Sequence, residues 1–389
     1  MNDQPQLPAD GNASASQWPA PLASRRDVVD ARHQRIASLL DQAELEGLLV
    51  LDPINFAWLT AGGQAQGTLS PEHWPGLYFS GSGRWLISCN LDTQRFFDEE
   101  IDQLGFQLKE WSWDRGRDLL LTDICYHRRV GCDLPYRDCQ ALGPTLATER
   151  RQLTDHEKTQ LARLGAVLVH ALEATARTLA LGESEEEIAG QLSHRLLHRG
   201  AEPVLLQVAA DGRASRYPRL GHGTATVQQS CLLTATARQN GLHASASRLV
   251  CFGPPEAALR EGHEAAARIT ASSVALSRAN VRIADVLAAQ QVAWKQAGHE
   301  HDWRLSPPSF LTGYAPVELL LTPGCAESLA LDRAIVWTAS VHGAVSCDTY
   351  LLEADGPIPI TRVESWPVRR IKIGELVVER PDILVRKKG

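Results

Sequence analysis

The sequence lacks the features that mark several special classes of protein. No apolar run approaches the roughly 18 residues that cross a bilayer, and the first residues carry neither a basic stretch nor an apolar segment. The eight cysteines contain no Cys-Xaa-Xaa-Cys pair, so we expect neither a zinc ribbon nor a disulfide framework. The net charge is -7, without a basic stripe. We therefore expect no nucleic-acid partner, no membrane partner and a cytoplasmic location.

Glycine-rich loops that bind phosphates are also missing. The Gly-Xaa-Gly sequences at 81–83 and 221–223 do not open a helix after a strand, so they indicate turns rather than a dinucleotide site. We expect no cofactor.

The chain is long enough for two domains. Its 389 residues are 44% hydrophobic, which is enough to bury a large core. The composition of residues 1–24 predicts a disordered tail, because Pro, Ala, Ser, Asn and Asp dominate without periodicity. We expect an α/β domain over 25–150 and a second domain over 151–389, in an α+β fold.

Helix and strand signals alternate along both predicted domains. Apolar spacing predicts a helix over 27–43, followed by a strand at LLVL and a hairpin over 76–90. Capping boxes at Thr154–Glu157 and Ser184–Glu187 each predict the start of a helix. Further strands are expected at 204–209, 230–237 and 245–252, and further helices near 255–277 and 282–297.

Several segments resemble the creatinase/aminopeptidase P family. EGLLVLDPINFAWLTAGG is similar to the family's "GLDALLVTDPANIRYLTG", and the two capping boxes match its "K-x-x-E-I" helix and "PGMTE" turn. The resemblance implies a creatinase N-terminal-like domain followed by a pita-bread peptidase-like domain. It also implies a homodimer.

Metal-dependent members of this family bind two divalent ions through Asp, Asp, His, Glu and Glu. Their segment "VLIDFGARYNGYCSDMTRTF" resembles CLLTATARQNGLHASASRLV, which places Thr234 and Ser245 at the two Asp positions. LTGYAPVE is similar to the "TGHGIG" strand and places Tyr314 at the His position. IVWTASVHGAVSCDTYLL resembles "FAWNPSITGTKSEDTFLV" and places Ala339 and Cys347 at the two Glu positions. Since these side chains carry no carboxylate, we expect no metal.

Catalysis without metal is an alternative, because creatinase itself uses a histidine as acid and base. The candidates are His222, in the loop before the LLTAT strand, and His243. Cys347 could act as a nucleophile with His243 or His342, or could simply fill space, and Tyr314 could donate its phenol to a ligand.

Three charged residues near the same place, Arg248, Glu318 and Asp348, could form a salt bridge that closes the former active site or could recognise a substrate. We favour the salt bridge. The leading hypothesis is a pseudopeptidase that binds a small molecule or peptide. The alternatives are a metal-independent C–N hydrolase and an Xaa-Pro metallopeptidase with an unforeseen metal site.

Overall fold

The computed structural model describes residues 24–65, 67–68 and 70–388. The predicted disordered tail lies outside these residues, except for Ser24. This serine is the N-cap of the first helix and forms a capping box with Asp27.

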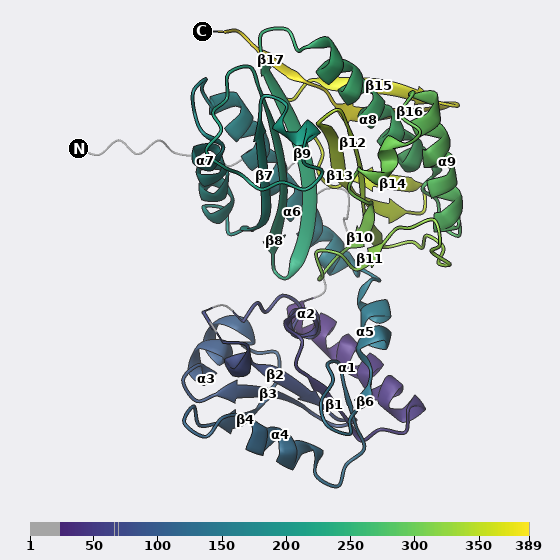
Figure 1. Cartoon of the computed structure of the whole chain (residues 1–389). Coiled ribbons are helices and arrows are strands. Elements are labelled where there is room, and N and C mark those ends of the chain that lie inside the picture. The colour runs from purple at the N-terminus through teal and green to yellow at the C-terminus, as the bar shows by residue number, and fades with distance from the viewer. Residues whose placement is uncertain (1–23, 66, 69, 389) are drawn as a thin grey trace, which may run out of the picture.

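The N-terminal unit is built on a mixed six-stranded sheet with the strand order β4-β3-β2-β1-β5-β6 (Figure 1). Helix α1 covers one face of this sheet and α4 covers the other, so two apolar clusters lie on either side of it. Its strands are β1 (Gly47–Val50), β2 (Gly76–Phe79), β3 (Arg84–Cys89), β4 (Gln107–Trp111), β5 (Val130–Cys132) and β6 (Gln140–Ala141). Its helices are α1 (Arg25–Gln42), α2 (Pro53–Leu59), α3 (Thr93–Arg95), α4 (Asp118–Cys125) and α5 (Gly143–Arg150).

The C-terminal unit holds a four-stranded sheet, β17-β9-β8-β7, a five-stranded sheet, β11-β10-β12-β13-β14, and the ribbon β15-β16. Its helices are α6 (Asp155–Thr178), α7 (Glu185–Leu197), α8 (Ala257–Leu276) and α9 (Ile283–Gln296). Its strands are β7 (Glu202–Ala210), β8 (Ser230–Gln239), β9 (Leu242–Phe252), β10 (Phe310–Thr312), β11 (Leu319–Leu320), β12 (Arg333–Val341), β13 (Ala344–Glu353), β14 (Gly356–Pro359), β15 (Val368–Ile373), β16 (Leu376–Pro381) and β17 (Leu384–Arg386).

The predicted helix starts are confirmed. Thr154 and Ser184 both form capping boxes, with Glu157 and Glu187 respectively, at the beginning of α6 and α7. Among the described residues, no helix is long and apolar enough to cross a membrane. The mixed α+β fold class is confirmed as well.

Helix α5 links the two units (Figure 1). It ends at Arg150, and the next helix, α6, begins at Asp155 in the C-terminal unit. The division of the chain at residues 150 and 151 stays a prediction.

Each sheet of the C-terminal unit has one face covered by helices. The apolar side chains of α6 pack against alternate residues of β8 and β9, and those of α8 and α9 pack against alternate residues of β12. Since successive side chains of a strand point to opposite faces, the residues between them face away from the helices. This inner face is where a site can form.

Helix α6 contains a glycine that the packing requires. A Cβ added at Gly165 would overlap the carbonyl oxygen of Ile360, whereas Gly190 of α7 has open space around it. We expect Gly165→Ala to lower the free energy of unfolding by about 1–3 kcal/mol, because overpacking outweighs the gain in helix propensity. The matched Gly190→Ala should raise it by about 0.5–1 kcal/mol. Chemical denaturation of both variants measures this, and equal effects would contradict the packing argument.

Candidate functional site

Two β-hairpins carry most of the predicted site residues. Both turn through two residues with positive φ, Asn240-Gly241 between β8 and β9 and His342-Gly343 between β12 and β13. Turns of this kind match the twist of the flanking strands and allow a single register. The turns therefore determine which side chains share a face.

The first hairpin presents hydroxyl groups on its inner face. Thr234 lies opposite Ser247, and Thr236 lies opposite Ser245. The hydroxyl oxygens of Thr236 and Ser245 are 2.8 Å apart. Thr234 is buried, and its Oγ1 atom has no hydrogen-bond partner among the described residues. Thr234 and Ser245, the two predicted Asp positions, thus lie on one face as diagonal neighbours.

The second hairpin corrects one of the predicted positions. Cys347 lies opposite Thr338, whereas Ala339 lies opposite Ser346. Ala339 packs between α8 and α9, so it faces away from Cys347 and the prediction that it shares the site is wrong. Thr338 occupies that place instead. Paired residues of a hairpin lie at equal distances from its turn. Counting outward from His342-Gly343 would therefore have predicted that Thr338 pairs with Cys347.

Hydrogen bonds between side chains and backbone hold the two hairpins together. The backbone N–H of Cys347 donates to Oγ of Ser247 (2.9 Å), which itself donates to the carbonyl oxygen of Val345 (2.9 Å). The hydroxyl of Thr349 accepts from the backbone N–H of Ser245 (2.8 Å) and donates to the carbonyl oxygen of the same residue (2.9 Å). Strands β9 and β13 are therefore fixed side by side, and the inner faces of both hairpins form one surface.

Tyr314 lies outside this surface. Its side chain is buried beside Arg32, with its hydroxyl 3.5 Å from a guanidinium nitrogen. Burial raises the pKa of this phenol far above its usual value, so Tyr314 stays neutral. Tyr314 lies beyond the end of β10, so the structure does not bring it together with Thr234, Ser245 and Cys347.

Phe310 and Thr312 of β10 lie on the same face as Thr338, and Phe310 is the nearer of the two to Thr338. Phe310 lies opposite Val336, two residues from Thr338 on the same face, and it is half-buried. Alignment of the last glycine of "TGHGIG" with Gly313 would have placed Phe310 at the His position. The inner surface thus combines Thr234, Ser245, Phe310, Thr338 and Cys347.

The chemistry of these five residues does not fit a pair of divalent cations. Hard cations are held by carboxylates and imidazoles, and the five side chains are hydroxyls, a thiol and a benzene ring. Burial, followed by the neighbouring charge of Asp348, raises the pKa of Cys347 to about 12, so its thiol stays protonated at neutral pH. Among the described residues, no three His, Cys, Asp or Glu side chains are grouped to hold a metal ion.

The two candidate histidines differ in their environments. His222 is exposed in its loop. His243 is buried on the inner face of β9, with Nδ1 3.1 Å from the carbonyl oxygen of Gly313, and burial lowers its pKa to about 4. His342, in a hairpin turn, is exposed and has its ring 4.8 Å from that of His299. Only His243 shares a face with Ser245 and Ser247.

The three charged residues predicted near the site do not act together. Arg248 forms buried ion pairs with Asp348 (3.2 Å) and with Glu173 of α6 (3.3 Å). Both lie on the helix-covered face, behind Cys347. Glu318 pairs instead with Arg150 of α5 (2.9 Å), so the prediction of one salt bridge among Arg248, Asp348 and Glu318 is wrong for Glu318.

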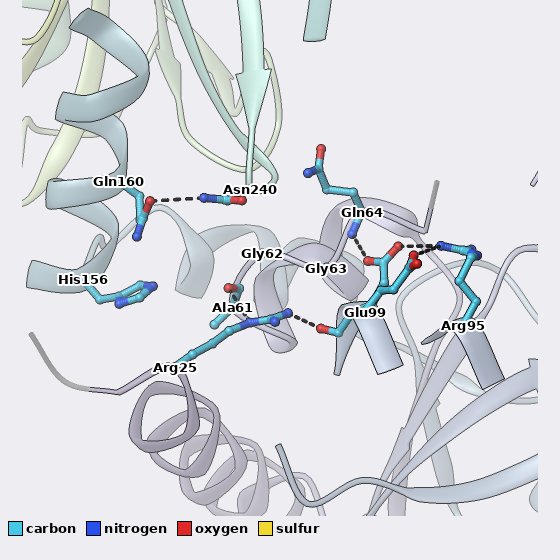
Figure 2. A pocket seen from close by; sticks show the side chains of 11 residues that line it. Arg25, Ala61, Gly62, Gly63, Gln64, Arg95, Glu99, His156, Gln160 and Asn240 are labelled. Carbon is cyan, nitrogen blue, oxygen red and sulfur yellow. Dashed lines mark hydrogen bonds and ion pairs between the residues drawn. The ribbon is translucent and has the colours of Figure 1, made fainter. Parts of the chain in front are cut away.

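A polar pocket of about 320 Å³ lies between the two units, next to the tip of the first hairpin (Figure 2). Asn240 of the turn bonds to Gln160 of α6 at 3.1 Å. Arg25 donates to carbonyl oxygens at the end of α2, and Arg95 pairs with Glu100 at 3.2 Å. Because both arginines bond to nearby protein groups, we interpret the pocket as part of the joint between the units.

Comparison with known proteins agrees with this architecture. A model of metallopeptidase family M24 matches residues 159–314. The prolidase from Pyrococcus horikoshii OT3 aligns with a TM-score of 0.73 and 14% identity, over 86% of this chain and 99% of that one. The X-Pro aminopeptidase from Thermotoga maritima MSB8 aligns with a TM-score of 0.73 and 16% identity, over 91% and 99%. The chain has the pita-bread fold of the creatinase/aminopeptidase P superfamily.

A further structure with the pita-bread fold is named as a subunit of a complex. It is the N-terminal domain of FACT complex subunit SPT16 from chickpea, with a TM-score of 0.61 and 9% identity, over 87% of this chain and 96% of that one. A search of curated proteins gives no match. Identities this low establish the fold of the chain and leave its chemistry to its own residues.

The buried ion pairs behind the site generate the first prediction about this region. Asp348 also pairs with Arg380 (2.9 Å), so Asp348→Ala removes a carboxylate shared by two buried arginines, of which Arg248 keeps only Glu173 as a partner. We expect a loss of about 3–5 kcal/mol in the free energy of unfolding. The control is Glu379→Ala, which breaks an exposed pair with Arg370 (3.1 Å) and should cost less than about 1 kcal/mol. Denaturant titration measures both, and a similar loss in the two variants would refute the prediction.

His243 makes stability depend on pH. Its pKa is about 4 in the folded chain against 6.5 for an ordinary histidine, so the unfolded chain binds the extra proton first as pH falls. The contribution of His243 to the free energy of unfolding is fully present above pH 6.5. It is lost as the pH falls from 6.5 to 4, by about 3 kcal/mol in all. We expect His243→Gln to reduce the change in the free energy of unfolding between pH 6.5 and pH 4, measured by denaturant titration at each pH. His222→Gln should leave this change as it is. An unaltered change in His243→Gln would show that another group causes it.

Proposed function

We propose that this pita-bread protein is a pseudopeptidase that binds a short peptide, or another small molecule bearing an amide, on the inner face of its two hairpins. The observation that carries the proposal is the pairing of Thr338 with Cys347 beside Thr234 and Ser245. A metallopeptidase needs carboxylates at such facing positions to balance two cations, and none of these four side chains supplies one.

The inner face is suited to a neutral polar ligand. It offers the hydroxyl of Thr338, the protonated thiol of Cys347 and the neutral imidazole of His243. Oγ1 of Thr234 is buried without a partner among the described residues, which costs free energy unless a ligand or water supplies a hydrogen bond. An amide can donate and accept at once. Two structures of the same fold are named as a prolidase and an X-Pro aminopeptidase, and their names support a peptide as the ligand. A third is named as a subunit of a complex.

A second candidate is metal-independent hydrolysis of a C–N bond with His243 as the base. The carbonyl oxygen of Gly313 lies 3.1 Å from Nδ1 and favours the tautomer with the proton on that nitrogen. Nε2 is then left as a proton acceptor on the inner face. The Xaa-Pro metallopeptidase ranks last, because it needs ligands that the five inner positions do not provide. The homodimer and the cytoplasmic location remain predictions.

The proposal is tested with the purified full chain. After incubation with Mn²⁺, Co²⁺ or Zn²⁺ and desalting, we expect far less than one bound metal ion per chain by mass spectrometry of the metals. Added metal should not produce cleavage of Xaa-Pro dipeptides. In thermal-shift measurements, members of an Xaa-Pro dipeptide panel and their amides should raise the midpoint of unfolding.

Thr234→Val separates binding from folding. The substitution removes an unpartnered buried hydroxyl, so the free protein should become more stable by up to about 1 kcal/mol, while the shift caused by a bound peptide should shrink. Thr148→Val, at an exposed position on α5, is the control and should change neither. Stoichiometric metal with metal-dependent cleavage would overturn the proposal. Metal-free cleavage that His243→Ala abolishes would establish the second candidate instead.

A further inference from the structure

Two thiols of the N-terminal unit lie within reach of each other. The Sγ atoms of Cys125 and Cys139 are 3.7 Å apart, although 14 positions separate the residues in the sequence. Cys125 is the last residue of α4, and Cys139 directly precedes β6. Both are half-buried, so reagents can reach them. A disulfide needs the sulfur atoms to approach to about 2.05 Å, which is a further movement of under about 2 Å.

The backbone on either side of the pair can absorb this movement. Each cysteine stands at the end of a regular element, next to a loop. His127 and Arg137 lie two residues away inside these loops and have positive φ, at 53° and 42°. Loop residues of this kind adjust more easily than residues within a helix or a sheet.

We infer that Cys125 and Cys139 form a redox-active dithiol that a small anionic disulfide, such as glutathione disulfide, converts into an intramolecular disulfide. One thiol attacks a sulfur of the small disulfide, whose S–S bond breaks and releases one thiol. The second cysteine then attacks the mixed disulfide and releases the other thiol. A new S–S bond joins Cys125 to Cys139, and the two protons leave on the two released thiols.

The surroundings of the pair favour an anionic reagent. Both cysteines line a depression of about 580 Å³ to which Arg128, Arg129 and Arg137 also contribute. Arg129 is paired with Glu44 at 3.3 Å. Burial and the neighbouring Cys139 raise the pKa of Cys125 to about 12, and the charges of Arg137 and Arg128 oppose this rise. The lining holds three arginines against two carboxylates, Glu44 and Asp138. Carboxylate groups of a small disulfide would meet a net positive charge there.

Cys132 is a third cysteine of this unit that could form a disulfide with Cys125 or Cys139 instead. It lies on β5, and its side chain is buried in the apolar cluster between the sheet and α4. Burial shields Cys132 from a dissolved reagent, whereas Cys125 and Cys139 are half-buried. The link between Cys125 and Cys139 should therefore form first.

The test uses the full chain, reduced and then exposed to glutathione disulfide in the absence of air. The intact mass should fall by two hydrogen atoms, and peptide mapping without reduction should join Cys125 to Cys139. Cys139→Ser should lose this change and should trap one glutathione on Cys125. Cys325→Ser, which removes a half-buried cysteine elsewhere, should behave as the unmodified chain does.

Two further measurements examine the charge and the structural effect. The reaction with anionic glutathione disulfide should be several-fold faster than with cationic cystamine, and Arg137→Gln should reduce this preference. The oxidised chain should unfold at a higher temperature, because the bond closes the loop around β5. A disulfide to Cys132, or no loss of thiols, would overturn the inference. Equal rates with the two reagents would overturn the preference for an anionic disulfide.

Discussion

The register of two hairpins determines what the inner surface of this protein can do. Positive φ at Asn240-Gly241 and His342-Gly343 fixes the pairing of each strand, and a shift of one residue would turn every side chain to the other face. The present register directs Thr234, Ser245, Thr338 and Cys347 to the inner face and directs Arg248 and Asp348 to the helix-covered face. The lack of a carboxylate at these four inner positions is therefore set by the pairing of whole strands. Replacing one residue would not restore a two-metal site.

A group of buried charges lies on the other side of the sheets. Arg248 connects Glu173 of α6 with Asp348 of β13, and Arg380 completes the group from β16. These ion pairs join α6, β9, β13 and β16 among buried side chains, where mismatched charges are costly. They fix the position of α6 against both hairpins. The positions of the strands that carry the hydroxyl-lined surface thus depend on ionic contacts behind it.

Much of the fold could be predicted from the sequence, because capping boxes, glycine turns and apolar spacing are local signals. The helix at 27–43 and the start of α6 at Thr154 follow from such signals. The site was harder. Thr234 and Ser245 lie on one face in the structure, and their assignment to the two Asp positions stays a prediction. Ala339 lies one residue from Thr338, a difference that the register of the His342-Gly343 turn could have shown. The position of Tyr314 was harder to predict, because nothing local in the sequence fixes the pairing of β10 with β12. The proximity of Cys125 and Cys139 had no sequence signal, since it depends on how α4 packs on the sheet.

The tip of the first hairpin also ties the two units together. A Cβ at Gly241 would lie 2.8 Å from the side chain of Ala57 in α2 and 2.9 Å from the ring of Tyr314. The turn is thus enclosed by the N-terminal unit on one side and by the end of β10 on the other. A ligand that displaces β8 and β9 must push α2 at the same time. The first hairpin and α2 therefore share one tightly packed contact, and neither can shift without the other adjusting.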